Sequence, residues 1–265
     1  MLALGTMATQ IARDGAEAQT TQTKLGARSL SWAGNLLAVG IFLPAALRPA
    51  LSVRPSAGAT AALVFSAVAL VAFLLATTLL NQALLRGRLR AEIRRNNLAA
   101  GLIAAAHAVA TGNVAAHCFA ADSLANLPVG AVFFGVSEVA LVVLSLLFRA
   151  LTAYADDQEI LGENMAAAIS YSGLLVALSL VVGHAADGAF VGWIPALRSF
   201  ALFLLCALLL YPVRQVVVAR LLLGLPVTWR GGALDRAIAQ DRSWLVSCVE
   251  AAGYLASAFL LTGLV

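Results

Sequence analysis

The sequence predicts an all-α polytopic transmembrane bundle of about seven helices, arranged as parallel two-helix internal repeats. Of the 265 residues, 62% are hydrophobic and 11% are charged, and the mean hydropathy is +0.92. Soluble domains contain roughly 45–50% apolar and about 25% charged residues. A water-soluble fold would therefore have too little interior for this apolar surface, whereas a bilayer supplies the missing apolar solvent. A helix of roughly 17–25 apolar residues is long enough to cross it.

Seven apolar stretches satisfy that length. We expect the membrane-spanning helices near residues 30–50, 58–84, 97–120, 127–151, 164–186, 196–215 and 243–264. The first stretch is the weakest, because Asn35 lies inside it and Pro44 lies near its end. Residues 1–28 lack the basic start and compact apolar core of a secretory signal. We therefore expect a polar cytoplasmic arm over 1–28 and a transmembrane domain over 29–265.

The basic residues predict the orientation of the chain in the membrane. If the amino terminus is cytoplasmic, that side receives 14 of the 17 Lys and Arg residues, and the other side receives only Arg48, Arg54 and Arg198. Under the positive-inside rule this split predicts a cytoplasmic amino terminus and a periplasmic carboxyl terminus in a bacterial inner membrane. The net charge of +4 is then a topology signal, not a sign of nucleic-acid binding. The expected partners are the lipid bilayer and other membrane proteins or further copies of the chain.

One sequence cassette occurs twice: an acidic residue, an isoleucine, an asparagine, and then a small-residue helix that ends in histidine. The first copy runs from Glu92 to His117 and the second from Glu159 to His184. The period of 67 residues fits two membrane-spanning helices with their loops. Copies separated by two crossings keep the same orientation, so an axis along the membrane normal should relate them. Repeat-like units are expected at about 58–120, 127–186 and 196–264.

The asparagines, Asn97 and Asn164, directly precede the helices of the two cassettes. An asparagine at this position accepts a hydrogen bond from a free amide of the first helical turn. Glu92 and Glu159 lie shortly before the same helix ends, where a carboxylate is favoured. We therefore interpret the cassette first as a capping device, with a functional site as the alternative.

The third copy of the repeat has diverged. Aligning Gly253 with Gly173 puts Trp244 at the position of the asparagine and Leu264 at that of the histidine. A site built by repetition should therefore involve only the first two copies. The helix of the first copy also carries Ala104, Ala108, Gly112 and Ala116 at four-residue spacing. Small residues at this spacing let helix backbones approach closely.

The segment 151–181, LTAYADDQEILGENMAAAISYSGLLVALSLV, resembles the YjfL-like bacterial inner-membrane proteins, the family of domain of unknown function 350. The family pattern is TPYD, an acidic–Ile pair, GNxAxAI and a glycine-containing helix. The matching residues here are Tyr154, Asp156, Glu159, Ile160, Asn164, Ala166, Ala168, Ile169 and Gly173. The chain departs from the pattern at Ala153, usually proline, and at Glu163, usually glycine. Short members have about half this length, so the chain resembles an internal duplication. The resemblance implies a multi-pass inner-membrane protein and supplies no activity.

Polar groups inside the predicted spans form the candidate site. In the last helix, one polar face recurs at spacings of four, three, four and three residues, formed by Ser243, Ser247, Glu250, Tyr254 and Ser257. Glu138 lies near the centre of the fourth helix and His107 near the middle of the third. A charged group at this depth costs about 2.5–3.5 kcal/mol on insertion scales, which favours a protonated acid, a basic partner or contact with water. His107 and Arg214 are the candidate partners of Glu250.

Two classes of function remain open. The first is a scaffold or partner subunit in an envelope-associated system, favoured by short loops and small-residue packing. The second is a small transporter or channel for protons or cations, in which Glu250, Glu138 and His107 line a path. A minor alternative is metal or haem binding by His117 and His184, which repeat symmetry places at equal depth near the outer face. The sequence has no GxSxG, HExxH or phosphate-binding glycine loop, so we expect neither an enzyme nor a cofactor.

Overall fold

The computed structural model describes residues 26–47, 55–119, 126–188 and 190–264. Residues 1–25, which make up most of the predicted polar arm over 1–28, lie outside the described residues. Arg48 and Arg54 lie outside them as well. The described part of the chain contains helices and no strands. The fold is therefore the all-α helical membrane bundle that the sequence predicts.

Seven long helical segments follow one another at the predicted places. They are the first helix, Gly26–Leu47; α2, Pro55–Ala83; α4, Leu98–Cys118; α5, Leu127–Ala150; α7, Met165–Ala185; the continuous segment Trp193–Leu222; and α11, Trp244–Gly263. Within the described residues, six of them are long and apolar enough to cross a membrane. The seventh, α2, contains a shorter apolar stretch, Ser66–Leu80. Three short helices precede α4, α7 and α11: α3, Leu89–Arg94; α6, Asp156–Leu161; and α10, Ala233–Ala239.

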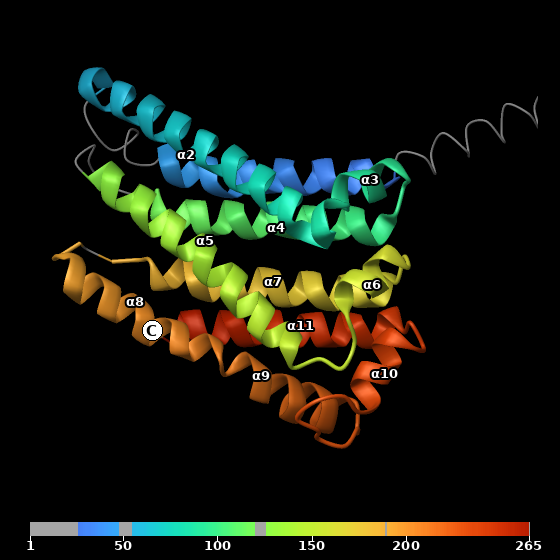
Figure 1. The fold of residues 1–265 in the computed structure, drawn as a ribbon. Helices are drawn as coiled ribbons and strands as arrows, with labels where there is room; N and C mark the ends of the chain where they lie inside the picture. The colour runs from blue at the N-terminus through green and yellow to red at the C-terminus, as the bar shows by residue number, and fades with distance from the viewer. Residues whose placement is uncertain (1–25, 48–54, 120–125, 189, 265) are drawn as a thin grey trace, which may run out of the picture.

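Four helices form a row in which every member runs in the same direction. The first helix, α4, α7 and α11 lie side by side, and α3, α6 and α10 gather at one end of the molecule (Figure 1). In α4 and α7 72% of the membrane-spanning window is buried, against 22% in the first helix and 39% in α11. The two well-buried helices thus form the middle of the row, and α2, α5 and α8, Trp193–Ala207, cross it at a tilt.

Close contacts between small residues hold neighbouring helices of the row together. A Cβ atom added to Gly112 would lie 2.7 Å from the Cα atom of Ala38, and one added to Gly101 would lie 2.5 Å from the carbonyl oxygen of Ala27. Both residues of the first helix and both glycines of α4 are 11 positions apart, so these two helices are parallel. Small residues at helix contacts in membranes permit this approach, as the small-residue spacing around Gly112 predicts.

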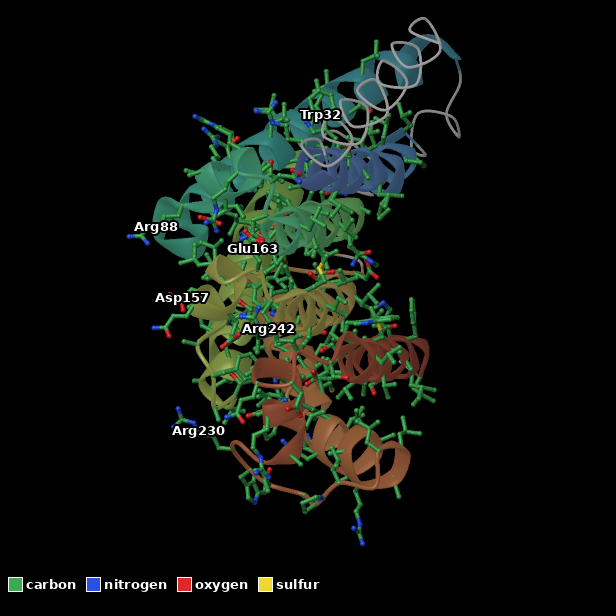
Figure 2. The ribbon with its side chains drawn as sticks, turned by 90° about the vertical axis from the view of Figure 1, so that its right-hand side faces the viewer. Trp32, Arg88, Asp157, Glu163, Arg230 and Arg242 are labelled. Carbon is green, nitrogen blue, oxygen red and sulfur yellow. The ribbon has the colours of Figure 1, made fainter. Side chains whose placement is uncertain are left out.

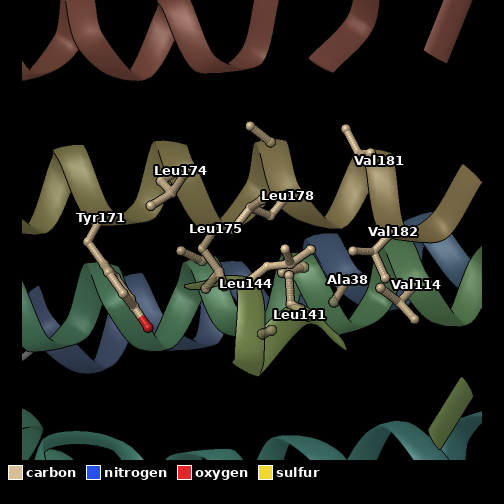
Figure 3. Close-up of a cluster of buried hydrophobic side chains, with 14 of the residues drawn as sticks. Ala38, Val114, Leu141, Leu144, Tyr171, Leu174, Leu175, Leu178, Val181 and Val182 are labelled. Carbon is tan, nitrogen blue, oxygen red and sulfur yellow. The ribbon is translucent and has the colours of Figure 1, made fainter. Parts of the chain in front are cut away.

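The core lies where α7 packs against α4 and α5. Leu175, Leu178 and Val182 of α7 and Leu141 of α5 are at most 1% exposed, and Figure 3 shows them between the three helices. A helix that is apolar all round is buried in the centre of a bundle. In contrast, α2, α5 and α8 turn large apolar side chains outwards, where a bilayer would contact them: Leu75, Leu79, Val139, Val143, Leu202 and Leu205.

The sixth long segment extends beyond its predicted end at residue 215 and is irregular. It consists of α8, then α9, Leu210–Val213, and then a π-helical stretch, Arg214–Leu222. Pro212 lies in α9 and has no backbone N–H to donate, and π-type turns are a recognised way for a helix to absorb such a break. Residues 216–223 are apolar except for Arg220, which allows the helix to continue. The break leaves Arg214 only 1% exposed, inside the bundle.

Candidate functional site

The cassette asparagines cap the helices that follow them, the role that their sequence position predicts. The side-chain oxygen of Asn97 accepts a hydrogen bond from the amide of Ala100 at 3.1 Å. That of Asn164 accepts one from the amide of Ala167 at 3.2 Å. Both asparagines are completely buried, so these caps lie inside the protein and not at a solvated surface.

Each asparagine also connects its own cassette to the next one. The Asn97 amide nitrogen donates to a Glu92 carboxylate oxygen at 2.9 Å and to the carbonyl oxygen of Ile160, at the end of α6, at 2.7 Å. The Asn164 amide nitrogen repeats this arrangement with Glu159 at 2.8 Å and with the carbonyl oxygen of Ile238, in α10, at 3.0 Å. The side-chain oxygen and both amide hydrogens are therefore in use. We call this link from one cassette to the next the asparagine staple.

A shared backbone conformation identifies the equivalent residue of the third cassette. The residue before each N-cap has a positive φ: 67° at Asn96, 60° at Glu163 and 50° at Arg242. The next residue is extended in all three cassettes, and in the third it is Ser243, the N-cap of α11.

The alignment that placed Trp244 at the asparagine position is therefore wrong by one residue. The turn before α11 is one residue longer, because the Ser243 amide bonds the carbonyl six positions back, whereas the asparagine amides bond the carbonyl five back. The Ser243 side chain makes no capping hydrogen bond. Serine has no amide group, so the third cassette lacks the staple.

A cluster of buried charges lies beside the third cassette. Arg214 forms an ion pair with Glu250 and another with Asp235, the latter at 2.6 Å between Nη2 and Oδ1. The three side chains are at most 3% exposed. The second oxygen of Asp235 accepts from the amides of Ala153 at 2.8 Å and Gly231 at 3.1 Å. Of the two predicted partners of Glu250, Arg214 makes the contact and His107 does not.

Glu250 faces the inside of the bundle together with three other residues of its polar stripe, and the fourth, Ser243, is half-buried. Ser247, Tyr254 and Ser257 are all at most 8% exposed. The second Glu250 oxygen, Oε2, is buried without a hydrogen-bond partner among the described residues. When ionised, one arginine and two carboxylates leave the cluster with one negative charge.

The second repeat unit contains a related ion pair. Arg149, at the end of α5, pairs with Asp156, the first residue of α6. Asp156 lies four residues before Ile160 and Asp235 lies three before Ile238, so the two aspartates occupy neighbouring positions of their cassettes. The Arg149 guanidinium also lies 4.2 Å from the centre of the Tyr171 ring. Sequence analysis did not identify these aspartates as partners of the arginines.

His107 and Glu138 lie apart from the Glu250 cluster. His107 Nε2 lies 2.9 Å from the Tyr171 hydroxyl oxygen, and His107 Nδ1 has no hydrogen-bond partner among the described residues. Glu138 has a single long contact, 3.5 Å from the Thr111 hydroxyl to Oε2. Among the described residues no hydrogen bond or ion pair joins these groups to Arg214, Asp235 or Glu250. His107 bonds Tyr171 and Glu138 bonds Thr111, so among the described residues no hydrogen bond or ion pair joins His107, Glu138 and Glu250 to one another.

His117 and His184 meet near the opposite end of the row, as repeat symmetry predicts, and share an aspartate that the sequence analysis missed. Their Nδ1 atoms lie 2.8 and 3.1 Å from the two carboxylate oxygens of Asp187, and their ring centres are 6.3 Å apart. His117 thus contacts one oxygen of the Asp187 carboxylate, and His184 contacts the other. Over the residues that the structure describes, no group of three or more His, Cys, Asp or Glu side chains is arranged to hold a metal ion.

Comparison with known proteins identifies the family. The model of the family described as Domain of Unknown Function (DUF350) matches residues 1–119 and again residues 122–265, so the chain belongs to this family and contains two copies of its domain. No curated protein and no solved structure matches the chain. The boundary between the copies lies between α4 and α5. Each family domain is therefore larger than the two-helix unit.

Proposed function

We propose that this two-copy DUF350 protein is a multi-pass scaffold or partner subunit of an envelope-associated system in the bacterial inner membrane. The stapled row of helices carries the proposal. Two buried asparagines fasten successive cassettes to one another, and small residues pack the helices closely. Such a row is suited to presenting fixed surfaces to other membrane proteins, because the links resist movement between its repeats.

The surroundings of Glu250 favour this reading over transport through that residue. Transport would require water to reach the carboxylate, whereas Arg214 pairs with it and both side chains are 1% exposed. A cavity of about 690 Å³ lies beside α9 and α11, and its lining consists of apolar residues and Ser257 without Glu250. The carboxylate therefore serves best as a structural partner of the arginine.

The outer members of the row supply surfaces for a partner. The first helix exposes Trp32 and Leu36 by more than 70%, and α11 exposes Phe259 and Leu260 by more than 60%. In the middle of the row, equivalent faces are covered by the neighbouring helix. We propose that a membrane helix of another protein, or of a second copy, covers α11.

The orientation is part of the proposal. The exposed charged residues Arg88, Glu163, Arg230 and Arg242 and the half-buried Asp157 lie along the cassette end that faces the viewer in Figure 2. By the positive-inside rule the arginine-rich end is cytoplasmic. The helices of the row then all begin at the cytoplasmic face.

The test is purification of the intact chain from its native membrane followed by mass determination in nanodiscs. We expect a complex of fixed stoichiometry, with a membrane partner or a second copy. Phe259→Ala with Leu260→Ala should weaken it, whereas the matched truncations Leu202→Ala and Leu205→Ala on α8 should not. A monomer that catalyses proton or cation flux in proteoliposomes above the level of empty liposomes would contradict the scaffold proposal.

A further inference from the structure

We propose that the groove between α2 and α5 is a binding site for a lipophilic amine, whose ammonium group pairs with Glu138. The groove has a volume of about 500 Å³. Among the described residues that line it, Glu138 is the only charged one, and the others include Leu75, Leu79, Phe134 and Val142. Pockets of roughly 300–1,000 Å³ with apolar walls and few polar groups are typical small-molecule sites. This inference is independent of the scaffold proposal.

Glu138 differs from the other buried carboxylates near the helix row. Asp156, Asp235 and Glu250 each pair with an arginine. Glu138 is only 9% exposed and contacts no basic side chain in the described part of the chain. Its Oε1 atom has no hydrogen-bond partner there, and its Oε2 atom has only the long contact with Thr111. A buried polar group without a partner is unfavourable, so the site is complementary to a ligand that brings a cationic N–H donor.

The position of Glu138 in the membrane favours a free amphiphile over a phospholipid headgroup. Glu138 lies 11 residues after the first residue of α5 and 12 before the last, or about 16–18 Å from either end at 1.5 Å per residue. The hydrocarbon core of a bilayer is about 30 Å thick, so this carboxylate lies near its centre, far from the headgroups. A small amine with an apolar body can reach this depth from the side, where Leu79 and Val139 are more than 60% exposed.

Binding is measured by equilibrium dialysis of radiolabelled octylamine against the full chain in phosphatidylcholine nanodiscs, with empty nanodiscs to subtract partitioning into lipid. We expect saturable binding of one octylamine per chain. Glu138→Gln, which keeps the shape of the side chain but removes its charge, should weaken binding by about 10- to 100-fold, the range of a hydrogen bond to a charged group. Unlabelled octylamine should compete, and octanol, which has the same apolar body but no charge, should not.

A steric test uses glycines. Gly135 lies in the groove lining, and a Cβ atom added there would meet nothing within 4 Å. Gly135→Leu should therefore fold normally, fill the groove and abolish binding. Gly40, in the first helix, is equally open, and Gly40→Leu is the matched control that should bind normally.

Three results would overturn the proposal. The first is no saturable binding above empty nanodiscs. The second is binding that Glu138→Gln and Gly135→Leu leave unchanged. The third is loss of octylamine binding when phosphatidylethanolamine is added to the nanodiscs, because the groove would then belong to a lipid headgroup.

Discussion

At the scale of single residues, the cassette asparagine has two roles that a cap alone does not explain. Asn97→Ala removes the cap of α4 and also the hydrogen bonds that the Asn97 amide group donates to the Ile160 carbonyl and the Glu92 carboxylate. Loss of a cap costs about 0.5–2 kcal/mol, and each further hydrogen bond that is lost adds about 0.5–1.5 kcal/mol. We expect a loss of unfolding free energy above the capping range, measured by detergent titration. Ser243→Ala, where no cap bond exists, should cost far less, and equal losses would exclude the staple.

The residue before each asparagine is constrained by its backbone. Glu163 has a φ of 60°, a conformation that costs an L-residue about 1–2 kcal/mol, and the family pattern has glycine here. Glycine loses more entropy on folding, by about 0.5–1 kcal/mol. Glu163→Gly should therefore raise the unfolding free energy by about 0.5–1 kcal/mol. Asn96→Gly should bring no gain, because the Asn96 side chain accepts a hydrogen bond from the Ala27 amide at 2.9 Å. Destabilisation by Glu163→Gly would refute the strain argument.

The buried charges predict strong coupling. Arg214→Leu leaves Asp235 and Glu250 without their cation, and breaking a buried ion pair costs about 3–5 kcal/mol. Glu250→Leu leaves Arg214 with Asp235 and should cost less. The double variant should be less destabilised than the sum of the two, as expected for residues in contact. Additive losses in a double-mutant cycle would mean that the pair does not act as a unit.

Local interactions in this chain could be predicted from sequence, and distant ones could not. The capping bond of Asn97 reaches only three residues ahead, and the inward face of α11 follows from helical periodicity, so both were accessible. The acceptor of the staple, Ile160, is 63 residues from Asn97. The carboxylate that contacts both His117 and His184 belongs to Asp187, which the repeated cassette does not include. These contacts depend on how the helices are arranged, which the sequence pattern did not specify.

At the scale of elements, the row depends on close helix contact. A Cβ atom on Gly173 of α7 would lie 2.3 Å from the Cβ atom of Ala251 in α11. Gly173→Ala should therefore force the two helices apart and cost about 1–3 kcal/mol, the usual range for overpacking. Ala251→Gly in the same chain should restore part of the loss. A Gly173→Ala variant as stable as the original chain in detergent would show that α7 and α11 can separate freely.

The helix positions followed from apolar stretches, but their irregularities did not. The long stretch after residue 193 was expected to end at 215, yet it continues to Leu222 through a π-helical segment. The hydropathy of this stretch gave no sign of the break, because hydropathy depends on the residue types and not on whether a turn is α-helical or π-helical. Arg214, the first residue of the π-helical segment, pairs with Glu250 and Asp235, which lie 36 and 21 residues further along the chain.

At the scale of the whole molecule, the two-copy family match and the two-helix unit describe different levels of repetition. The second copy contains two complete units, α5 to α7 and α8 to α11. In the first copy, the first helix occupies the row position of α4, α7 and α11, and α2 to α4 form one complete unit. The sequence period of 67 residues identified the unit, while the resemblance to short family members identified the duplication.

The parallel row predicts seven crossings and opposite locations for the two ends. The first helix and α4 are parallel, because Ala27 and Ala38 face Gly101 and Gly112 in the same order. The chain between them must return across the membrane, so α2 crosses even though its apolar stretch is short. Alkaline phosphatase fused after Val265 should therefore be active in the periplasm, and a fusion within α6 at Asp157 should be inactive. Inactive phosphatase at both sites, with a fluorescent protein bright at both, would place Asp157 and Val265 on the same side of the membrane and exclude the parallel row.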